Sequence, residues 1–339
     1  MTRALVTGST GGVGSNLAEA LIERGIEVVG LRRSTSPDDA VEGLQMQFVT
    51  GDILKPETLR PALDGIDWVF HVAAIADDWK YPAEMVHKVN VGGARNVMQV
   101  ALDAGVKRFV LTSSSSALGK AEYEKQLMDE TKEYNLKPGV WPYGYSKYLA
   151  NHAMREFADR GLPAVSVMPS AIMGPRDLKF ISGELLVRVL KRQTFPFPRG
   201  GLNWIDTRDV VEGHIAAAEK GRPGETYVLG GENMTHIEYM DIVGDVLKVK
   251  PRILKIPRFI LPPFAASVTL LHKLGVTLPI ERARVLMSGT YIWYDTTKAV
   301  SELGLTTRPF ADTVRDTYEW YQDNGYFKKR GISASRLAA

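Results

Sequence analysis

The sequence predicts an α/β fold with a doubly wound parallel sheet and a smaller C-terminal lobe. Short apolar runs alternate with amphipathic stretches through the first half of the chain, and the runs are rich in Val, Ile and Leu, as buried parallel strands are. This alternation implies right-handed crossover connections, with helices on both faces of the sheet. The strands are expected at residues 4–7, 27–31, 45–49, 68–72, 108–112 and 164–168.

Helical patterns connect these runs. Residues 14–24 and 85–104 are amphipathic, and a third helix is expected from Tyr143 to about residue 160. Pro and Gly interrupt the second half, where 226–229 resembles one more strand, so the chain is expected to leave the sheet near Pro169, return and leave again. The expected division is a sheet domain at 1–168, joined by about 203–230, a second lobe from 169–202 and 231–326, and a polar tail at 327–339.

The composition excludes several classes of protein. The chain has 339 residues, 45% of them hydrophobic and 24% charged, as in ordinary globular proteins. A net charge of +3 without a basic block gives no reason to expect nucleic acid or a membrane as partner. Cysteine is absent and the histidines are scattered, so no metal site is expected.

No targeting or membrane-spanning segment is predicted. The N-terminus lacks the apolar core and cleavage site of a signal peptide. The most apolar late stretch, 259–271, is interrupted by Pro262 and Pro263 and is too short to span a bilayer. We therefore expect a cytoplasmic protein.

A glycine-rich turn follows the first predicted strand and opens the first predicted helix. Residues 7–14 read Thr-Gly-Ser-Thr-Gly-Gly-Val-Gly. Glycines permit a tight turn and let the backbone approach a pyrophosphate, which the free N–H groups of the helix N-terminus then bind. The alternative is an ordinary tight turn. The expected dinucleotide contacts are Gly8, Thr10, Gly11, Gly12, Val13 and Gly14.

The end of the second strand indicates which dinucleotide binds. NAD-binding folds place Asp or Glu there on the ribose 2′-hydroxyl, whereas this chain has Arg32 and Arg33. Guanidinium groups suit a 2′-phosphate, so NADP(H) is the expected cofactor; the alternative is that both arginines lie on a solvated loop. Asp52, followed by Ile53, is a candidate to accept a hydrogen bond from the adenine amino group, with capping of a turn as the alternative.

Tyr143 and Lys147 are spaced to lie on one face of a helix. A lysine ammonium beside a phenol lowers the phenol pKa, and such a tyrosine exchanges protons with a carbonyl or alcohol oxygen. A serine run at 113–116 follows the fifth strand, where ligands bind in such folds, and one hydroxyl is a candidate to hydrogen-bond the reacting oxygen. The alternatives are a surface Tyr–Lys pair and an ordinary serine-rich turn.

Together these motifs resemble the extended short-chain dehydrogenase/reductase family, whose members are epimerase/dehydratase-like, over nearly the whole chain. The resemblance rests on the glycine turn, His71-Val-Ala-Ala, Asn90-Val-Gly-Gly, the serine run, Tyr143-xxx-Lys147 and 169–175, all in the family's order. Residues 230–233 and 294–299 are most similar to the branch with dihydroflavonol reductase-like and hopanoid-associated sugar epimerase-like proteins. The resemblance implies a Rossmann-type fold whose second lobe binds substrate.

The resemblance also implies roles for single residues. Tyr143 would be the catalytic acid/base, and Lys147 would lower its pKa and bind the nicotinamide ribose. Ser114 would orient the substrate oxygen, because the active Ser or Thr of relatives lies five residues before a glycine, here Gly119. Ser115 is the alternative. Further cofactor contacts would come from Ala73, Ala74, Pro169 and Ser170.

The function expected from these features is an NADP(H)-dependent carbonyl reductase or alcohol dehydrogenase acting on a small organic substrate. Sugar dehydratases of the family carry an acidic pair where this chain has Ser115 and Ser116, and sugar epimerases show Asp where it has Arg32. The alternatives are a nucleotide-sugar epimerase that retains its cofactor and a non-catalytic NADP-binding sensor. The candidate substrate contacts are Trp79, Ser115, Met173 and Trp204. For each large apolar residue the alternative is ordinary core, which is the more common place for such side chains.

Assembly is also implied by the resemblance. Relatives pair through two helices per subunit, which correspond to about 85–104 and 146–160. We expect a homodimer with a two-fold interface, with a monomer as the alternative.

Overall fold

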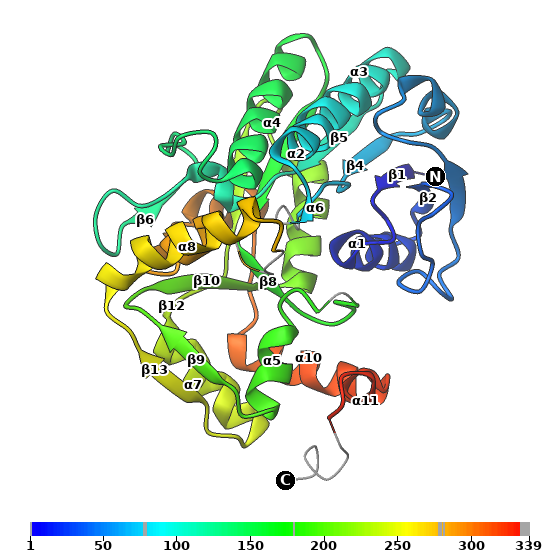
Figure 1. Ribbon diagram of the computed structural model, residues 1–339. Helices are drawn as coiled ribbons and strands as arrows, with labels where there is room; N and C mark the ends of the chain where they lie inside the picture. Colours follow the sequence, from blue (N-terminus) through cyan, green and yellow to red (C-terminus); the bar gives the residue numbers. More distant parts are fainter. Residues whose placement is uncertain (1, 77–79, 179, 277–279, 281, 333–339) are drawn as a thin grey trace.

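The computed structural model describes residues 2–76, 80–178, 180–276, 280 and 282–332. A seven-stranded, fully parallel sheet in the order β11-β7-β5-β4-β1-β2-β3 forms the centre of the first domain (Figure 1). Its strands are β1 (Arg3–Thr7), β2 (Glu27–Arg32), β3 (Gln47–Thr50), β4 (Trp68–His71), β5 (Arg108–Thr112), β7 (Ala164–Pro169) and β11 (Thr226–Leu229).

The predicted doubly wound fold is confirmed. Each strand expected from an apolar run is present, with ends that differ by a residue or two from the predicted ones. Strand order reverses between β1 and β4, so the chain builds outward in two directions from the middle of the sheet. This is a Rossmann-like arrangement, in which ligands bind outside the carboxyl ends of the strands at the point of reversal.

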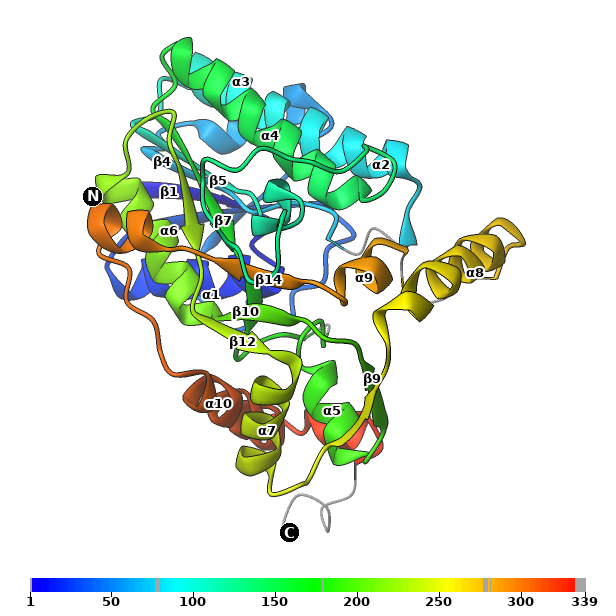
Figure 2. The same ribbon diagram turned by 90° about the vertical axis from the view of Figure 1, so that its left-hand side faces the viewer.

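Helices cover both faces of this sheet (Figures 1 and 2). On one face α1 (Gly12–Glu23) and α6 (Thr207–Lys220) bury Leu17 and Ile215 against Val110 of β5. On the other face α3 (Ala94–Ala104) and α4 (Pro142–Asp159) bury Met98 and Met154 against Phe109. Alternate residues of β5 thus enter separate cores, as the two-residue period of a strand requires.

The expected helix at 85–104 is not one continuous α-helix. The structure has α2 (Ala83–His87), a π-helical segment η4 (Lys88–Gly93) and then α3. Asn90, buried in the π segment, accepts a hydrogen bond from Ile75 N–H at 2.8 Å and donates to Ile75 O and to Ser146 Oγ, each at 3.0 Å. The wider turn therefore joins α4 to the segment after β4, and such π turns are frequent at functional sites.

A second sheet organises the C-terminal lobe. It has the order β12-β10-β14-β6, with β8 paired to β10, and β9 pairs separately with β13. Of the segment 203–230 that was expected to rejoin the first domain, α6 and β11 do so, whereas β10 lies in this second sheet. The strands are β6 (Leu127–Met128), β8 (Ala171–Met173), β9 (Thr194–Phe197), β10 (Gly201–Asp206), β12 (Glu232–Thr235), β13 (Arg252–Lys255) and β14 (Tyr291–Tyr294).

Helices of the second lobe enclose an aromatic core in which Tyr239 and Tyr321 are buried. These helices are α5 (Glu184–Leu190), α7 (His236–Leu247), α10 (Phe310–Asp323) and α11 (Tyr326–Lys329), whereas α8 (Leu261–Lys273) and α9 (Arg282–Met287) pack on each other in a separate cluster. Short 3₁₀ and π segments are η1 (Pro56–Thr58), η2 (Arg60–Leu63), η5 (Ser115–Leu118), η6 (Arg258–Ile260) and η7 (Ala299–Leu303). Within the described residues, none of these helices is long and apolar enough to cross a membrane.

The polar tail does not begin at residue 327, where the sequence predicted it. Phe327 of α11 is buried, with its ring centroid 5.4 Å from that of Tyr318 and 5.5 Å from that of Tyr321, and Ile332 is buried in the same core. The apolar side chains of Phe327 and Ile332 thus belong to the core of the second lobe. The basic residues that surround them along the chain gave no sign of this burial.

The Asn90 contacts predict a measurable loss of stability. Asn90→Ala leaves both backbone groups of Ile75 without their side-chain partner, so the free energy of unfolding should fall by roughly 1–3 kcal/mol. Urea denaturation measures this. The control Gln322→Ala changes an exposed position of α10 and should shift stability by no more than about 0.5 kcal/mol. Equal unfolding midpoints for Asn90→Ala and wild type would contradict this prediction.

Candidate functional site

Four strand ends of the parallel sheet bring the predicted site residues to one edge. The glycine turn follows β1, Ala73 follows β4, the serine run follows β5, and Pro169 ends β7. These strands are consecutive neighbours in the sheet, so their carboxyl ends lie along one edge of it, which we call the crevice edge because ligands of such folds bind outside these ends.

The backbone of the glycine turn depends on two of its glycines. Gly8 has φ +71°, and a Cβ there would lie 2.8 Å from the backbone of Ala73. A Cβ on Gly14 would lie 2.2 Å from the carbonyl oxygen of Gly8. At Gly12 the nearest heavy atom to such a Cβ, the carbonyl oxygen of Arg176, is 3.8 Å away. Gly8 and Gly14 are thus required by close packing, whereas the backbone at Gly12 is open to a ligand.

The N-terminus of α1 suits an anion. Its N-cap is Gly11, and in the part of the chain that the structure describes no side chain caps this end and no acidic residue lies in its first turn. Thr10 and Val13 flank the glycines of the turn. Uncapped N–H groups at the positive end of the helix dipole fit the diphosphate of a dinucleotide.

A loop from the second lobe also reaches this turn, which the sequence analysis did not predict. Asn16 Nδ2 donates to Gly12 O at 2.7 Å and to Pro175 O at 3.4 Å. Arg176 forms an ion pair with Glu19 of α1. The segment after β8 therefore packs directly against α1 beside the glycines.

His71 and Thr7 shape the next strand end. Thr7 Oγ1 and His71 Nδ1 are 2.8 Å apart, and Ala73 N–H donates to Thr7 Oγ1 at 3.2 Å, which positions Ala73 beside the glycine turn. The cofactor contact of Ala74, the next residue, stays a prediction. Burial, together with the positive charge of Lys147, lowers the pKa of His71 to about 3. Neutral His71 therefore serves here to hold Thr7 and the backbone of Ala73 in place.

Arg32 is held by groups that the sequence analysis did not single out. It forms an ion pair with Asp38, and its guanidinium carbon lies 4.3 Å from the ring centroid of Phe48. Arg33 is exposed at the same end of β2. Both arginines therefore lie where the second strand ends, and Arg32 is already paired with the carboxylate of Asp38.

Asp52 caps a turn in this structure. Its Oδ1 accepts a hydrogen bond from Leu54 N–H at 2.9 Å. Ile53 is buried, and its carbonyl oxygen accepts from Asn96 Nδ2 at 2.9 Å. The capping alternative is thus observed, and the adenine contacts of Asp52 and Ile53 stay a prediction.

Lys147 is buried on the first turns of α4. Its Nζ donates to the carbonyl oxygen of Thr112, at the end of β5, at 2.8 Å, and lies 5.8 Å from the ring centroid of the half-buried Tyr143. Burial lowers the pKa of Lys147 to about 8. The structure brings the predicted Tyr–Lys pair to the end of β5, where the serine run begins.

The serines of this run have different surroundings. Ser114, half-buried, is the N-cap of η5, and its Oγ accepts from Ser116 N–H at 3.2 Å and from Ser116 Oγ–H at 3.0 Å. Ser115 is buried and shares a side-chain hydrogen bond with Tyr294, whose pKa is raised by burial. Ser114 and Ser115 are therefore chemically distinct positions.

A buried hydroxyl marks the end of β7. Ser170 follows Pro169, and its N–H donates to Leu229 O at 2.9 Å. Among the described residues, Ser170 Oγ is buried without a hydrogen-bond partner. Because buried polar groups are normally satisfied, this hydroxyl is suited to hydrogen-bond a ligand in the crevice.

Two of the candidate substrate contacts lie in the core of the second lobe. Met173 is fully buried there, and Trp204 stacks on Phe310 with ring centroids 5.4 Å apart. Trp79 lies outside the described residues. A substrate role for these residues stays a prediction, and core packing accounts for the positions of Met173 and Trp204.

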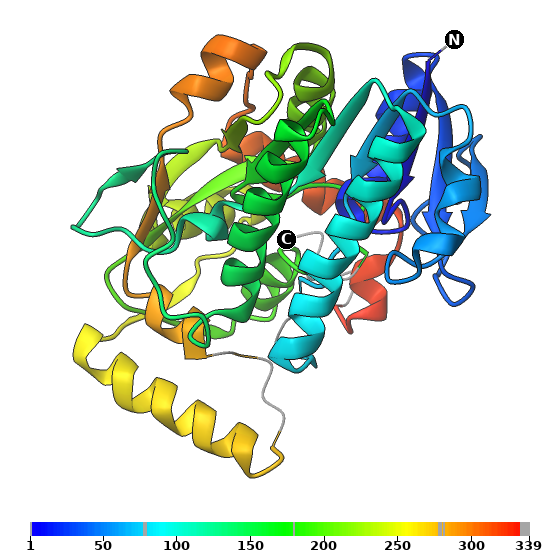
Figure 3. The same cartoon turned by 90° about the horizontal axis from the view of Figure 1, so that it is seen from above.

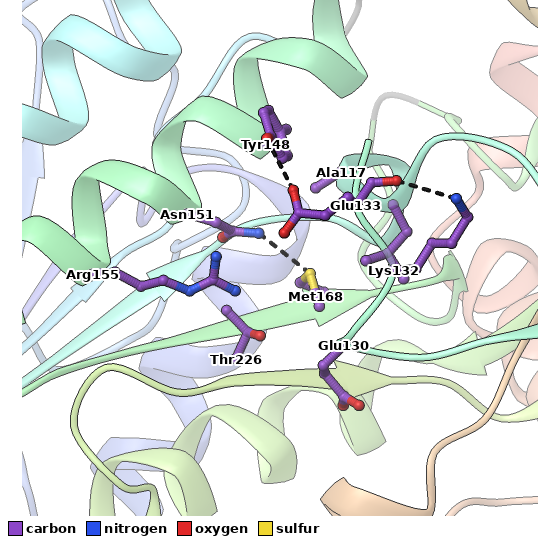
Figure 4. Close-up of a pocket in the computed structure, with 10 residues that line it drawn as sticks. Ala117, Glu130, Lys132, Glu133, Tyr148, Asn151, Arg155, Met168 and Thr226 are labelled. Carbon is purple, nitrogen blue, oxygen red and sulfur yellow. Dashed lines mark hydrogen bonds between the residues drawn. The ribbon is translucent and has the colours of Figure 1, made fainter. Parts of the chain in front are cut away.

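A small cavity lies beside α4 (Figure 4). Tyr148, Asn151 and Arg155 line it opposite Glu130 and Thr226, and its volume of about 10 Å³ accommodates no more than a water molecule. Within the described residues, no cluster of His, Asp and Glu could hold a metal ion. Neither feature competes with the crevice edge as the site of organic chemistry.

Known proteins share this architecture. The model of the NAD-dependent epimerase/dehydratase family matches residues 4–230. A Synechocystis sp. protein named provisionally as a dihydroflavonol 4-reductase is 34% identical over 329 residues, 95% of each chain. Sterol demethylase protein B of Methylococcus capsulatus is 30% identical over 337 residues, 95% of this chain and 98% of its own. The crystal structure of gox2253 has a TM-score of 0.84 at 35% identity, covering 96% of this chain and 99% of that one.

The match includes the glycine turn, the serine run, the Tyr–Lys pair and Ser170, which are the features that meet at the crevice edge. Two relatives match almost end to end, so the second lobe is shared as well. The chain therefore belongs to the NAD-dependent epimerase/dehydratase family and is an oxidoreductase of the extended short-chain dehydrogenase/reductase type.

Proposed function

We propose that the protein is an NADP(H)-dependent reductase or dehydrogenase that interconverts a carbonyl and an alcohol. The observation that carries the proposal is the buried Lys147, bonded to Thr112 O and adjacent to Tyr143, at the same crevice edge as an uncapped glycine turn. The provisional reductase name of the Synechocystis relative supports this choice of reaction.

The residues of the crevice edge would share the work of the reaction. A bound nicotinamide dinucleotide supplies hydride transfer, and the open backbone at Gly12 with the α1 N-terminus would hold its diphosphate. Tyr143 would move a proton to or from the substrate oxygen. The Lys147 ammonium, in a site of low dielectric constant, would favour the phenolate form of Tyr143.

Ser114 is the serine that we assign to the substrate oxygen. Its Oγ already accepts hydrogen bonds from the N–H and the hydroxyl of Ser116, which leaves its own proton to donate. Ser115 points its hydroxyl into a buried bond with Tyr294. The two accepted bonds would polarise the Ser114 hydroxyl toward a developing negative charge on the substrate.

The proposed preference for NADP(H) rests on Arg32 and Arg33 at the end of β2. The Phe48 ring supports the Arg32 guanidinium from one side, so this donor is pre-positioned for a 2′-phosphate. Asp38 is the competitor for the same guanidinium. The same arginines disfavour the alternative of a sugar epimerase with tightly held NAD. A homodimer through α3 and α4 stays a prediction.

Removing the Tyr143 hydroxyl should abolish most turnover. Tyr143→Phe keeps the ring, so folding and NADPH binding should persist while turnover falls by about 10²-fold or more, the usual size of a lost general acid/base. NADPH oxidation across a panel of aryl and alicyclic ketones measures this. Tyr145→Phe, which removes a hydroxyl from another half-buried tyrosine two residues away, is the matched control and should change turnover less than about twofold. Wild-type turnover in Tyr143→Phe would exclude the mechanism.

The two neighbouring serines should differ in their effects. Ser114→Ala should lower turnover by roughly 10-fold or more with little change in NADPH affinity, because it removes a donor to the substrate oxygen. Ser115→Ala should leave turnover nearly intact and lower the melting temperature, because Tyr294 loses its buried partner. Steady-state kinetics and thermal denaturation separate the two effects, and the opposite order would assign the active position to Ser115.

Cofactor preference should depend on Arg32 and its carboxylate partner. Wild type should bind NADPH at least several-fold tighter than NADH, and Arg32→Asp should remove this preference, because a charged hydrogen bond contributes roughly 1.5–3 kcal/mol. Asp38→Asn should increase the affinity for NADPH but not for NADH, because it releases Arg32 from its ion pair. Asp39→Asn, at the exposed neighbouring position, is the control and should change neither affinity. Fluorescence titration gives each dissociation constant. Equal affinities of the wild type for both cofactors would refute the assignment.

A further inference from the structure

Helix α8 projects from the body of the second lobe (Figures 2 and 3). One stripe of the helix packs inward: Leu261, Ala265 and Val268 are buried against Val285 of α9. These positions are four and three residues apart and therefore form one helical face. This packing holds α8 against α9 and involves only one face of the helix.

The outward faces of α8 are also apolar. Phe264 is 51% exposed, Leu270 58% and Leu274 70%, and Phe259 just before the helix is 76% exposed. From 259 to 271 the sequence contains no Asp, Glu, Lys or Arg. A helix that is apolar all round is normally buried in protein or lipid, and monomeric proteins rarely expose a continuous apolar patch of this kind.

Basic residues occur in the segment that leads into α8. Residues 246–276 contain no Asp or Glu. The segment leading into α8 instead carries basic side chains, of which Arg252 and Lys255 are exposed, and Arg258 approaches Glu124 at 3.8 Å. Lys248 and Lys250 precede β13, which runs from α7 towards α8 (Figure 1), so the lysines and arginines nearest to α8 along the chain are Lys255, Arg258 and Lys273.

We propose that α8 and this basic margin bind the surface of a lipid bilayer that contains anionic headgroups. The apolar side chains would enter the boundary between headgroups and acyl chains, and the basic ones would contact phosphates. A helix of 13 residues is about 20 Å long, shorter than the hydrocarbon core of about 30 Å, so it lies on the bilayer and does not span it. The net charge of +3 gave no reason to expect a membrane partner because it is a sum over the whole chain. It does not reveal that residues 246–276 carry basic but no acidic side chains.

The charge pattern favours lipid over a second copy of the chain. Two copies of this surface would bring like charges together at the margin of the interface, which opposes association. An anionic bilayer complements both parts of the surface. The inference does not depend on the proposed reaction, since binding requires neither cofactor nor substrate.

Vesicle co-sedimentation of the full chain tests the proposal. Wild type should sediment with phosphatidylglycerol/phosphatidylcholine vesicles, more weakly with phosphatidylcholine alone, and less as salt is raised. Phe264→Asp and Leu270→Asp should each lower the bound fraction several-fold. The matched control is Val300→Asp, because Val300 is 51% exposed but lies on η7, away from α8, and this variant should bind as wild type does. Circular dichroism should confirm that all variants are folded.

Three outcomes would overturn the proposal. The first is wild type that stays in the supernatant with anionic vesicles. The second is binding that Val300→Asp and Phe264→Asp reduce equally, since the apolar face of α8 would then have no special role. The third is a vesicle-free dimer, measured by light scattering, that Phe264→Asp converts to a monomer, because a second copy would then cover this face.

Discussion

A buried ammonium group joins α4 to the central sheet. Lys147 is almost fully removed from solvent, and its hydrogen bond to Thr112 O compensates part of the cost of burying its charge. Ser113 Oγ, next along the chain, donates to the carbonyl oxygen of Lys147 at 3.4 Å. Each of the two segments, the end of β5 and the start of α4, therefore donates a hydrogen bond to the other. Tyr143 lies on the same helix as Lys147.

Asn90 extends this connection to the third element of the site. Its side chain contacts both backbone groups of Ile75 and the hydroxyl of Ser146, and that hydroxyl donates to Tyr143 O at 2.7 Å. The segment after β4, the π turn and the first turn of α4 thus form one hydrogen-bonded unit. A single displaced member would move the Tyr143 backbone relative to the strand ends.

Two kinds of surface surround this rigid centre. At the end of β2 the Arg32 guanidinium contacts both Asp38 and the Phe48 ring, so a phosphate that bound there would replace one anionic partner with another. At α8 the outward apolar side chains stay largely exposed, because the buried stripe of Leu261 and Val268 uses only one face of the helix. The first surface suits a small anion, and the second suits an extended apolar phase.

The sequence by itself determined the elements whose signals are local. Apolar runs such as 108–112 and 226–229 became strands of the central sheet, because a buried parallel strand needs continuous apolar residues. The glycine turn and the Tyr143–Lys147 spacing also depend only on near neighbours. Their convergence at one crevice edge could be expected, since carboxyl ends of parallel strands share an edge.

Tertiary structure decided what depends on residues far apart in the chain. Trp204 became core because Phe310 stacks on it, and Phe327 became core because Tyr318 and Tyr321 surround it. The different surroundings of Ser114 and Ser115 arise from Tyr294, far along the sequence. Local patterns specify backbone conformation and which faces are apolar, whereas the partner of each face is chosen by packing between distant segments.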